Sequence, residues 1–129
     1  MLASAVDRVR TIALALPEVD ERFSHGAVCY FVAGTRPLCY YHDHHNDDRI
    51  SLWCPAPPGA AHGRVAAEPL RFFRPPTSAS GTFSTWVGVY LDLVPADELA
   101  WDDIADIIEQ AYRCVAPKRL VAELGTPRT

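Results

Sequence analysis

The chain has 129 residues and a formal net charge of −4, and 49% of its residues are hydrophobic. A chain of this size can bury one hydrophobic core, and this apolar content excludes disorder along its whole length. The acidic balance argues against strong non-specific binding to nucleic acid, because such binding normally requires a basic footprint. We therefore expect a single domain that spans residues 1–129.

The sequence predicts neither a targeting segment nor a membrane span. Asp7, Arg8 and Arg10 occupy the stretch where a signal peptide would have an apolar core. No apolar run approaches the roughly 20 residues that a membrane-spanning helix needs. The four cysteines lack the paired spacing of a zinc or redox site, and we expect them to be reduced. These features favour a cytoplasmic protein.

The first predicted elements are a helix and two strands. Apolar residues recur at helical spacing over residues 3–15, and Pro17 ends the pattern. The runs 28–33 and 38–42 are rich in β-branched and aromatic residues, as strands are. A weaker edge strand is expected around residues 22–24.

A turn at Gly34-Thr35 defines the expected pairing of these two strands. With a two-residue turn, Cys29 faces Tyr40 and Cys39 faces Tyr30. Side chains alternate between the faces of a strand, so Cys29 and Cys39 then point to opposite faces. We expect no disulfide between them.

The remaining pattern predicts further helices and strands in an α+β arrangement. Strands grouped between helices indicate an antiparallel twisted sheet of about five strands, with the helices packed on one face. The predicted elements are a polar turn at 42–48, a strand at 49–54, a marginal helix at 58–67, a loop at 74–84, a strand at 85–91, an amphipathic helix at 101–115 and a short helix at 117–125.

Three short motifs indicate a family. They are Phe72-Phe73-Arg74-Pro75-Pro76, Trp86-Val87-Gly88-Val89 and Ala116-Pro117-Lys118-Arg119-Leu120. In sequence and spacing they resemble the MmcQ/YjbR family, and the resemblance extends over residues 10–124. It implies a small α+β protein of CyaY-like fold, in a family whose members are often labelled DNA-binding. The chain departs from the family pattern at Thr77, where relatives tend to have Tyr, and in a longer loop at 78–85.

Strand alternation defines a candidate binding face. Ile50, Leu52 and Cys54 share one face of their strand, as Val87, Val89 and Leu91 do on theirs, and these aliphatic sets suit a core under the helices. The opposite face then carries, around a gap at Gly88, the residues Arg49, Trp53, Trp86 and Tyr90. Such a face is suited to stacking bases or other planar ligands. The alternative interpretation is that the 74–84 loop or a second subunit covers these aromatics.

The sequence favours a binding protein over an enzyme. It contains no nucleophile elbow and no phosphate-binding loop, and we expect no cofactor. The leading hypothesis, taken from the family resemblance, is weak nucleic-acid binding by a monomer or homodimer. The rival hypothesis is a small planar or anionic metabolite bound on the same face. The candidate residues are Arg49, Trp53, Arg71, Arg74, Trp86, Tyr90, Lys118 and Arg119.

A third, disfavoured hypothesis is a metal-dependent enzyme at the 42–48 turn. His42, His44 and His45 would be its ligands, since imidazole with nearby carboxylates suits zinc, iron or nickel. Their spacing matches no established metal motif, and polar turn residues are usually solvated. A solvated face is likewise the favoured interpretation of an acidic stripe on the last long helix, formed by Asp102, Asp106 and Glu109.

Overall fold

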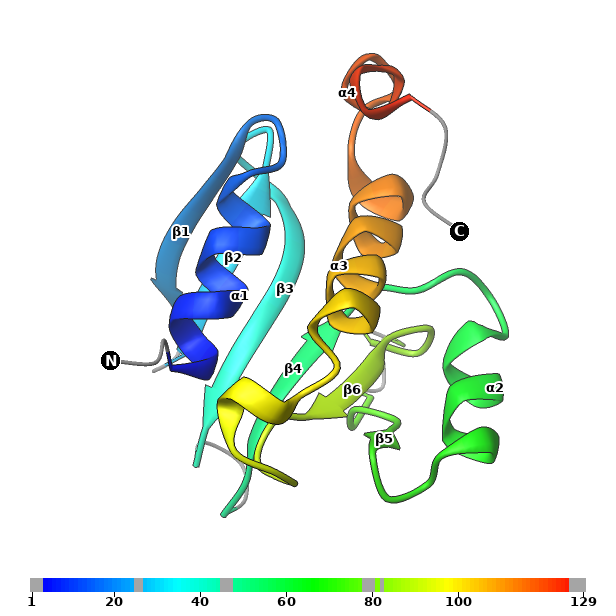
Figure 1. Cartoon of the computed structure of the whole chain (residues 1–129). Coiled ribbons are helices and arrows are strands. Elements are labelled where there is room, and N and C mark those ends of the chain that lie inside the picture. Colours follow the sequence, from blue (N-terminus) through cyan, green and yellow to red (C-terminus); the bar gives the residue numbers. More distant parts are fainter. Residues whose placement is uncertain (1–3, 25–26, 45–47, 78–80, 82, 126–129) are drawn as a thin grey trace.

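The computed structural model describes residues 4–24, 27–44, 48–77, 81 and 83–125. These residues form an open antiparallel sheet of six strands, in the order β1-β2-β3-β4-β6-β5, and four α-helices (Figure 1). The strands are β1 (Val19–Ser24), β2 (Ala27–Val32), β3 (Arg36–Asp43), β4 (Ile50–Cys54), β5 (Phe72–Phe73) and β6 (Val87–Tyr90). The helices are α1 (Ala5–Leu14), α2 (Ala60–Ala67), α3 (Trp101–Val115) and α4 (Lys118–Leu124), with a 3-10 turn η1 (Ala96–Glu98). The expected α+β class is confirmed, with six strands where about five were expected.

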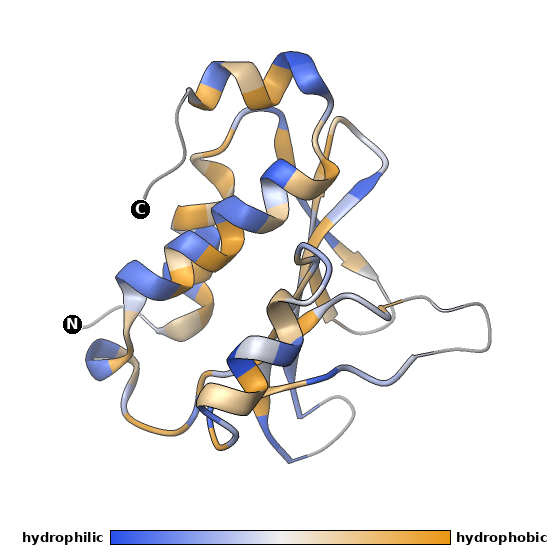
Figure 2. Ribbon diagram, turned by 90° about the vertical axis from the view of Figure 1, so that its right-hand side faces the viewer, coloured by the Kyte–Doolittle hydropathy of each residue, from blue (hydrophilic) through white to orange (hydrophobic). Residues whose placement is uncertain are grey.

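Helices α1 and α3 cover one face of the sheet. α1 packs on β1, and α3 packs on β3 and β4. α2 flanks the β5 edge, and α4 lies beyond the end of α3 (Figure 1). The view turned by 90° shows these helices on one side of the strands, with the hydrophilic surface of α3 directed away from the sheet (Figure 2). None of the helices in the described ranges is both long and apolar enough to cross a bilayer.

Helix α3 supplies most of the helical side of the core. Its inward residues recur every three or four positions, as on one face of a helix, and include Ile104, Ile107, Ile108, Ala111 and Tyr112. The helix stops at Val115 because Pro117 disfavours helical geometry at the residue before it, and Ala116 is extended. The Tyr112 hydroxyl donates a 2.8 Å hydrogen bond to the Pro17 carbonyl, which joins the end of α3 to the α1–β1 connection.

The β2–β3 hairpin has the predicted pairing at its centre but not at its turn. Cys29 faces Tyr40 and Tyr30 faces Cys39, as the sequence predicts, so Cys29 and Cys39 lie on opposite faces. The prediction of a two-residue turn is wrong, because the register shifts between Tyr30 and Phe31. Leu38 is the extra residue of a β-bulge, and its side chain is fully buried in the core. The turn therefore has three residues, 33–35.

The other predicted strands and helices have the expected type, but some differ from the prediction in length. The weak edge strand expected at 22–24 is the six-residue β1. The strand expected at 85–91 is shorter, because β6 begins at Val87. β5 was not predicted, and its two residues pair with β6 through Phe72–Val89 and Phe73–Gly88. The helices expected at 58–67 and 117–125 are observed as α2 and α4.

Candidate ligand-binding face

The neighbouring strands β4 and β6 place their aliphatic residues on the helix-facing side of the sheet. Leu52 and Cys54 of β4 are fully buried there. Val87 and Val89 of β6 are also at most 1% exposed. The alternation predicted from sequence is therefore observed. The aromatic residues that alternate with these aliphatic residues along the same strands lie on the opposite side of the sheet.

We call that opposite side the aromatic face. β3 contributes Tyr40 and His42, and β4 contributes Trp53, which pairs with Tyr40 across the two strands. The remaining rings come from β2, β5, β6 and the β5–β6 connection. The described rings that make up the aromatic face are Phe31, Tyr40, His42, Trp53, Phe73, Phe83, Trp86 and Tyr90.

Phe83 is the centre of this cluster. Its ring centroid lies 4.7 Å from Trp86, 5.5 Å from Trp53 and 5.8 Å from Tyr40, in each case edge to face. Edge-to-face packing at such distances is a favoured arrangement of aromatic rings. The β5–β6 connection thus covers part of the face with Phe83, which is the alternative that the sequence left open.

The gap expected at Gly88 is filled by Phe73. These two residues are cross-strand partners, and a Cβ on Gly88 would lie 2.2 Å from the Phe73 ring. Phe73 stacks on Tyr90, with 4.6 Å between the ring centroids. Gly88 is therefore required for close packing, and it leaves no open slot at this point of the sheet.

Burial divides the aromatic face into a floor and an outer layer. Trp53 and His42 are each 7% exposed, and their rings lie 4.2 Å apart. Tyr40 and Trp86 are only partly buried, and their rings lie 5.4 Å apart with an interplanar angle of 36°. Trp53 is thus part of the floor, whereas Trp86 and Tyr40 are accessible from solvent.

Arg49 lies at one end of the aromatic face, where it contacts Asp92 and Tyr90. It forms an ion pair with Asp92, with 2.7 Å between Nη2 and Oδ1, and its guanidinium lies 3.8 Å from the centre of the Tyr90 ring. Asp92 also accepts the Ile50 backbone N–H at 3.1 Å. The hydrogen bond from Arg49 is the main reason that the pKa of Asp92 lies below its usual range.

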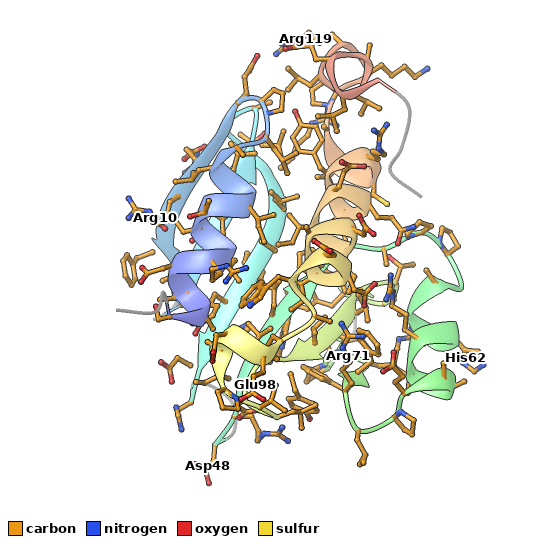
Figure 3. All side chains as sticks on the ribbon, viewed as in Figure 1. Arg10, Asp48, His62, Arg71, Glu98 and Arg119 are labelled. Atoms are coloured by element: carbon orange, nitrogen blue, oxygen red, sulfur yellow. The ribbon has the colours of Figure 1, made fainter. Side chains whose placement is uncertain are left out.

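The other predicted basic residues lie elsewhere. Arg71 pairs with Asp103 of α3 at 2.7 Å and with Glu68 at 3.2 Å, on the helix side of the molecule. Arg119 pairs with Glu18 at 2.6 Å and lies at the α4 end, far from Arg71 (Figure 3). Lys118 precedes Arg119 on α4 and shares its remote position.

Among the basic candidates, Arg74 lies in the β5–β6 connection itself, directly after β5. Its guanidinium donates a hydrogen bond to the Ser84 carbonyl, next to Phe83. The structure therefore brings together Arg49, Trp53, Trp86 and Tyr90, with Arg74 bound to the covering loop, but it does not bring Arg71, Lys118 or Arg119 to the same face.

The predicted metal ligands lie in different surroundings. His42 is buried against Trp53, while the His44 side chain is 59% exposed and pairs with Asp43. The hydrogen bond that His44 donates to the Asp43 carboxylate raises the pKa of His44. His45 lies outside the described residues. Within the described ranges, no three His, Cys, Asp or Glu side chains are grouped closely enough to hold a metal ion.

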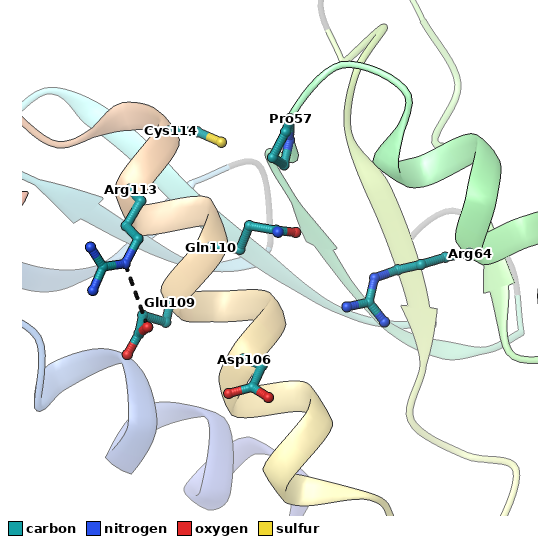
Figure 4. A pocket seen from close by; sticks show the side chains of 7 residues that line it. All are labelled: Pro57, Arg64, Asp106, Glu109, Gln110, Arg113 and Cys114. Atoms are coloured by element: carbon teal, nitrogen blue, oxygen red, sulfur yellow. Dashed lines mark ion pairs between the residues drawn. The ribbon is translucent and has the colours of Figure 1, made fainter. Parts of the chain in front are cut away.

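A separate cavity lies between α2 and α3. Its volume is about 380 Å³, and Figure 4 shows Asp106, Glu109 and Arg113 on α3, with Arg64 of α2 across the opening. Glu109 and Arg113 form an ion pair at 3.5 Å. Charges of both signs line this cavity, so the acidic stripe predicted on this helix is partly balanced by arginines.

Several residues of the aromatic face were not assigned to it from sequence, and His42 was considered there only as a metal ligand. Tyr40 and His42 alternate along β3, and this signal was available in the sequence. Phe31 and Phe73 become neighbours of the face only through strand pairing. Phe83 comes from a loop, where no periodicity predicts the direction of a side chain.

The fold and the aromatic face together define the class of this protein. The chain is a small α+β domain whose open antiparallel sheet has helices on one face and an aromatic cluster on the other. The YjbR family model matches residues 14–114, and the chain belongs to the YjbR family. This confirms the resemblance seen in its motifs.

The fold is shared with a solved relative of low sequence similarity. The crystal structure of Deinococcus radiodurans protein DR2400, which contains the domain DUF419, is similar with a TM-score of 0.68 and 20% sequence identity. The similarity covers 95% of this chain and 88% of the other. No curated protein matches the chain.

Proposed function

We propose that this protein is a non-catalytic binding protein that holds a planar, uncharged aromatic ligand on the aromatic face. The observation that carries the proposal is the pair of partly exposed rings Tyr40 and Trp86, 5.4 Å apart, over a buried floor that includes Trp53. Stacking on such rings contributes about 1–3 kcal/mol per base in nucleic-acid complexes, and any planar heteroaromatic presents a similar surface.

Tyr40 and the floor residue Trp53 support this proposal because the sheet holds both in fixed positions. Tyr40 and Trp53 are a cross-strand pair of the two central strands, which are hydrogen-bonded on both sides. Behind them, on the other face of the sheet, lie fully buried core residues such as Leu52. A ligand that meets rings held in this way loses little free energy in ordering the protein.

The charge distribution favours an uncharged ligand over nucleic acid. Arg49 and Arg71 are paired with carboxylates, and so is Arg119. To contact phosphates they would have to give up these partners. They also lie on different parts of the molecule, whereas a nucleic-acid site needs several cations along one surface.

The test is ligand binding measured by tryptophan fluorescence in a Trp101→Phe background. Trp101 lies on the helix side, where Arg8 is 4.9 Å from its ring, so this substitution leaves Trp53 and Trp86 as the reporters. Adenosine and caffeine serve as uncharged planar probes, and a single-stranded oligonucleotide serves as the charged one.

We expect saturable quenching by at least one uncharged probe, with Kd at or below about 1 mM. That Kd should change less than about twofold between about 50 and 200 mM salt, because no counterions are released. Two outcomes would contradict the proposal. One is the absence of quenching by either uncharged probe. The other is binding of the oligonucleotide alone with a steep loss of affinity as salt rises, which would favour the nucleic-acid hypothesis.

A further inference from the structure

We infer that Phe83 occupies, in the free protein, the place that a ring of the ligand takes, so that binding displaces a side chain of the protein itself. This inference rests on the proposed function and concerns the same face. It assigns to Phe83 the role of an internal competitor, and it defines the ligand as a planar ring system that fits between Tyr40, Trp53 and Trp86.

The first support is the geometry of the site around Phe83. The interplanar angles between Phe83 and its three neighbours are 84° for Tyr40, 79° for Trp53 and 77° for Trp86. A single ring therefore meets three aromatic walls, all nearly perpendicular to it. Such a site selects a flat aromatic group, because a non-planar group of similar volume lacks the edge-to-face contacts.

The second support is the backbone of Phe83. Its φ is +69°, in the left-handed region that bulky side chains rarely adopt. A residue keeps such a conformation only where its surroundings enforce it, and these conformations are concentrated at ligand sites and switch regions. The contacts of the Phe83 ring offset this cost. A ligand ring that makes the same contacts would allow Phe83 to relax.

The third support is that Tyr40 and Trp53 are held in strands of the sheet, whereas Phe83 is held in a loop. Tyr40 belongs to β3 and Trp53 to β4, and the sheet fixes both positions. Phe83 belongs to the β5–β6 connection, where the described hydrogen bonds are local. The Trp86 N–H donates to the Phe83 carbonyl at 3.1 Å, the Ser84 N–H donates to the Gly81 carbonyl at 3.0 Å, and Arg74 donates to the Ser84 carbonyl. Trp86 lies in the same connection, three residues after Phe83, so the walls that keep their positions when Phe83 leaves are Tyr40 and Trp53.

The experiment is ¹⁹F NMR of protein labelled with 4-fluorophenylalanine, titrated with adenosine and caffeine. The chain has five phenylalanines, and a Phe83→Leu variant assigns the resonance of Phe83. We expect either probe that binds to shift the Phe83 resonance toward the position of the free amino acid. Phe72 is 1% exposed in the core under the helices, so its resonance should not move and serves as the internal control.

Affinity gives the second measurement. Removal of an internal competitor raises the population of the binding-competent state, so Phe83→Ala should bind the same probe at least about tenfold more tightly. Phe23→Ala is the matched control, because Phe23 is 79% exposed on β1 and is not one of the rings of the aromatic face. This variant should change the affinity less than about twofold.

The outcomes separate this inference from the proposed function. If a probe binds the wild-type protein without moving the Phe83 resonance, or if Phe83→Ala gains no affinity, Phe83 is not the competitor although the aromatic face still binds. If Phe83→Ala binds and the wild-type protein does not, Phe83 fills the site permanently and is not displaced, so the inference is overturned together with the proposed function of the wild-type protein. If neither protein binds any probe, the proposed function itself fails.

Discussion

Gly88 shows how one residue without a side chain shapes the aromatic face. The Phe73 ring lies directly over it, at a distance that any Cβ would violate. Gly63 in α2 offers the opposite case, because a Cβ there would have nothing within 4 Å. The same substitution at these two glycines should therefore have opposite effects.

We predict that Gly88→Ala lowers the free energy of unfolding by about 1–3 kcal/mol, because Phe73 must leave its position. Gly63→Ala should raise it by about 0.5–1 kcal/mol, since Ala is the better helix former. Urea denaturation of both variants checks the pair. A Gly88→Ala protein as stable as the wild type would show that Phe73 does not lie over this strand.

Asp92 makes a pH-dependent contribution to stability. Its pKa is lower in the folded protein because Arg49 donates to its carboxylate, so folding is favoured while this group is ionised. The contribution is present above the usual carboxyl pKa and is lost as pH falls through the lowered pKa. We expect Asp92→Asn to lose about 1 kcal/mol at neutral pH and to reduce the loss of stability in acid. Thermal unfolding of both proteins from pH 7 to pH 2 measures this, and parallel curves would exclude the role.

At the scale of elements, the central strand β4 is buried on both faces. Leu52 is fully buried under the helices, and Trp53 is 7% exposed beneath the rings of the aromatic face. A strand of an antiparallel sheet with helices on one face usually has one wet side. Here the β5–β6 connection, with Phe83, supplies the second cover.

We predict that Trp53→Ala costs about 3–5 kcal/mol, as deletion of a buried ring does. Leu52→Ala should cost about 2–5 kcal/mol on the other face. Trp86→Ala should cost less than either, about 1–2 kcal/mol, because Trp86 is partly exposed. Guanidinium denaturation of the three variants gives the order. A Trp53→Ala protein within about 0.5 kcal/mol of the wild type would mean that the aromatic face is open.

Sequence patterns predicted the parts of this architecture that local chemistry decides. Alternation placed Trp53 and Trp86 on the helix-free face. The Cys29–Tyr40 pairing was predicted from a two-residue turn that is wrong, and it is observed because the bulge at Leu38 compensates for the third residue of the turn. The bulge at Leu38 was missed because the burial of that side chain depends on packing rather than on the turn. Phe83 was missed for a similar reason: a loop has no period, and the rings that hold Phe83 come from distant strands.

At the scale of the whole molecule, the basic residues singled out from sequence lie on different parts of the described structure. Arg119 at the α4 end and Arg71 beside α3 lie far apart (Figure 3), and each is paired with a carboxylate. The segment 116–120 ends α3 and begins α4. Its Arg119 has a structural role, because its ion pair with Glu18 joins α4 to the start of β1.

We predict that duplex DNA binds no more tightly than about 10⁻⁴–10⁻⁶ M at physiological salt, the range of non-specific contacts. The net charge is −4, and Arg49, Arg71 and Arg119 are paired with carboxylates, so few of the candidate cations are left to contact phosphates. A gel shift at about 0.15 M salt checks this. Sequence-specific binding in the nanomolar range would contradict the prediction.

The measurement that tests the central claim most directly is a map of backbone amide shifts in ¹H–¹⁵N NMR spectra during titration with adenosine and caffeine. If the aromatic face binds planar ligands, the largest shifts occur at Tyr40, Trp53 and residues 83–86, with little change on α4. If the largest shifts instead occur around Lys118 and Arg119, or along the cavity between α2 and α3 (Figure 4), the ligand site is elsewhere and the account is wrong.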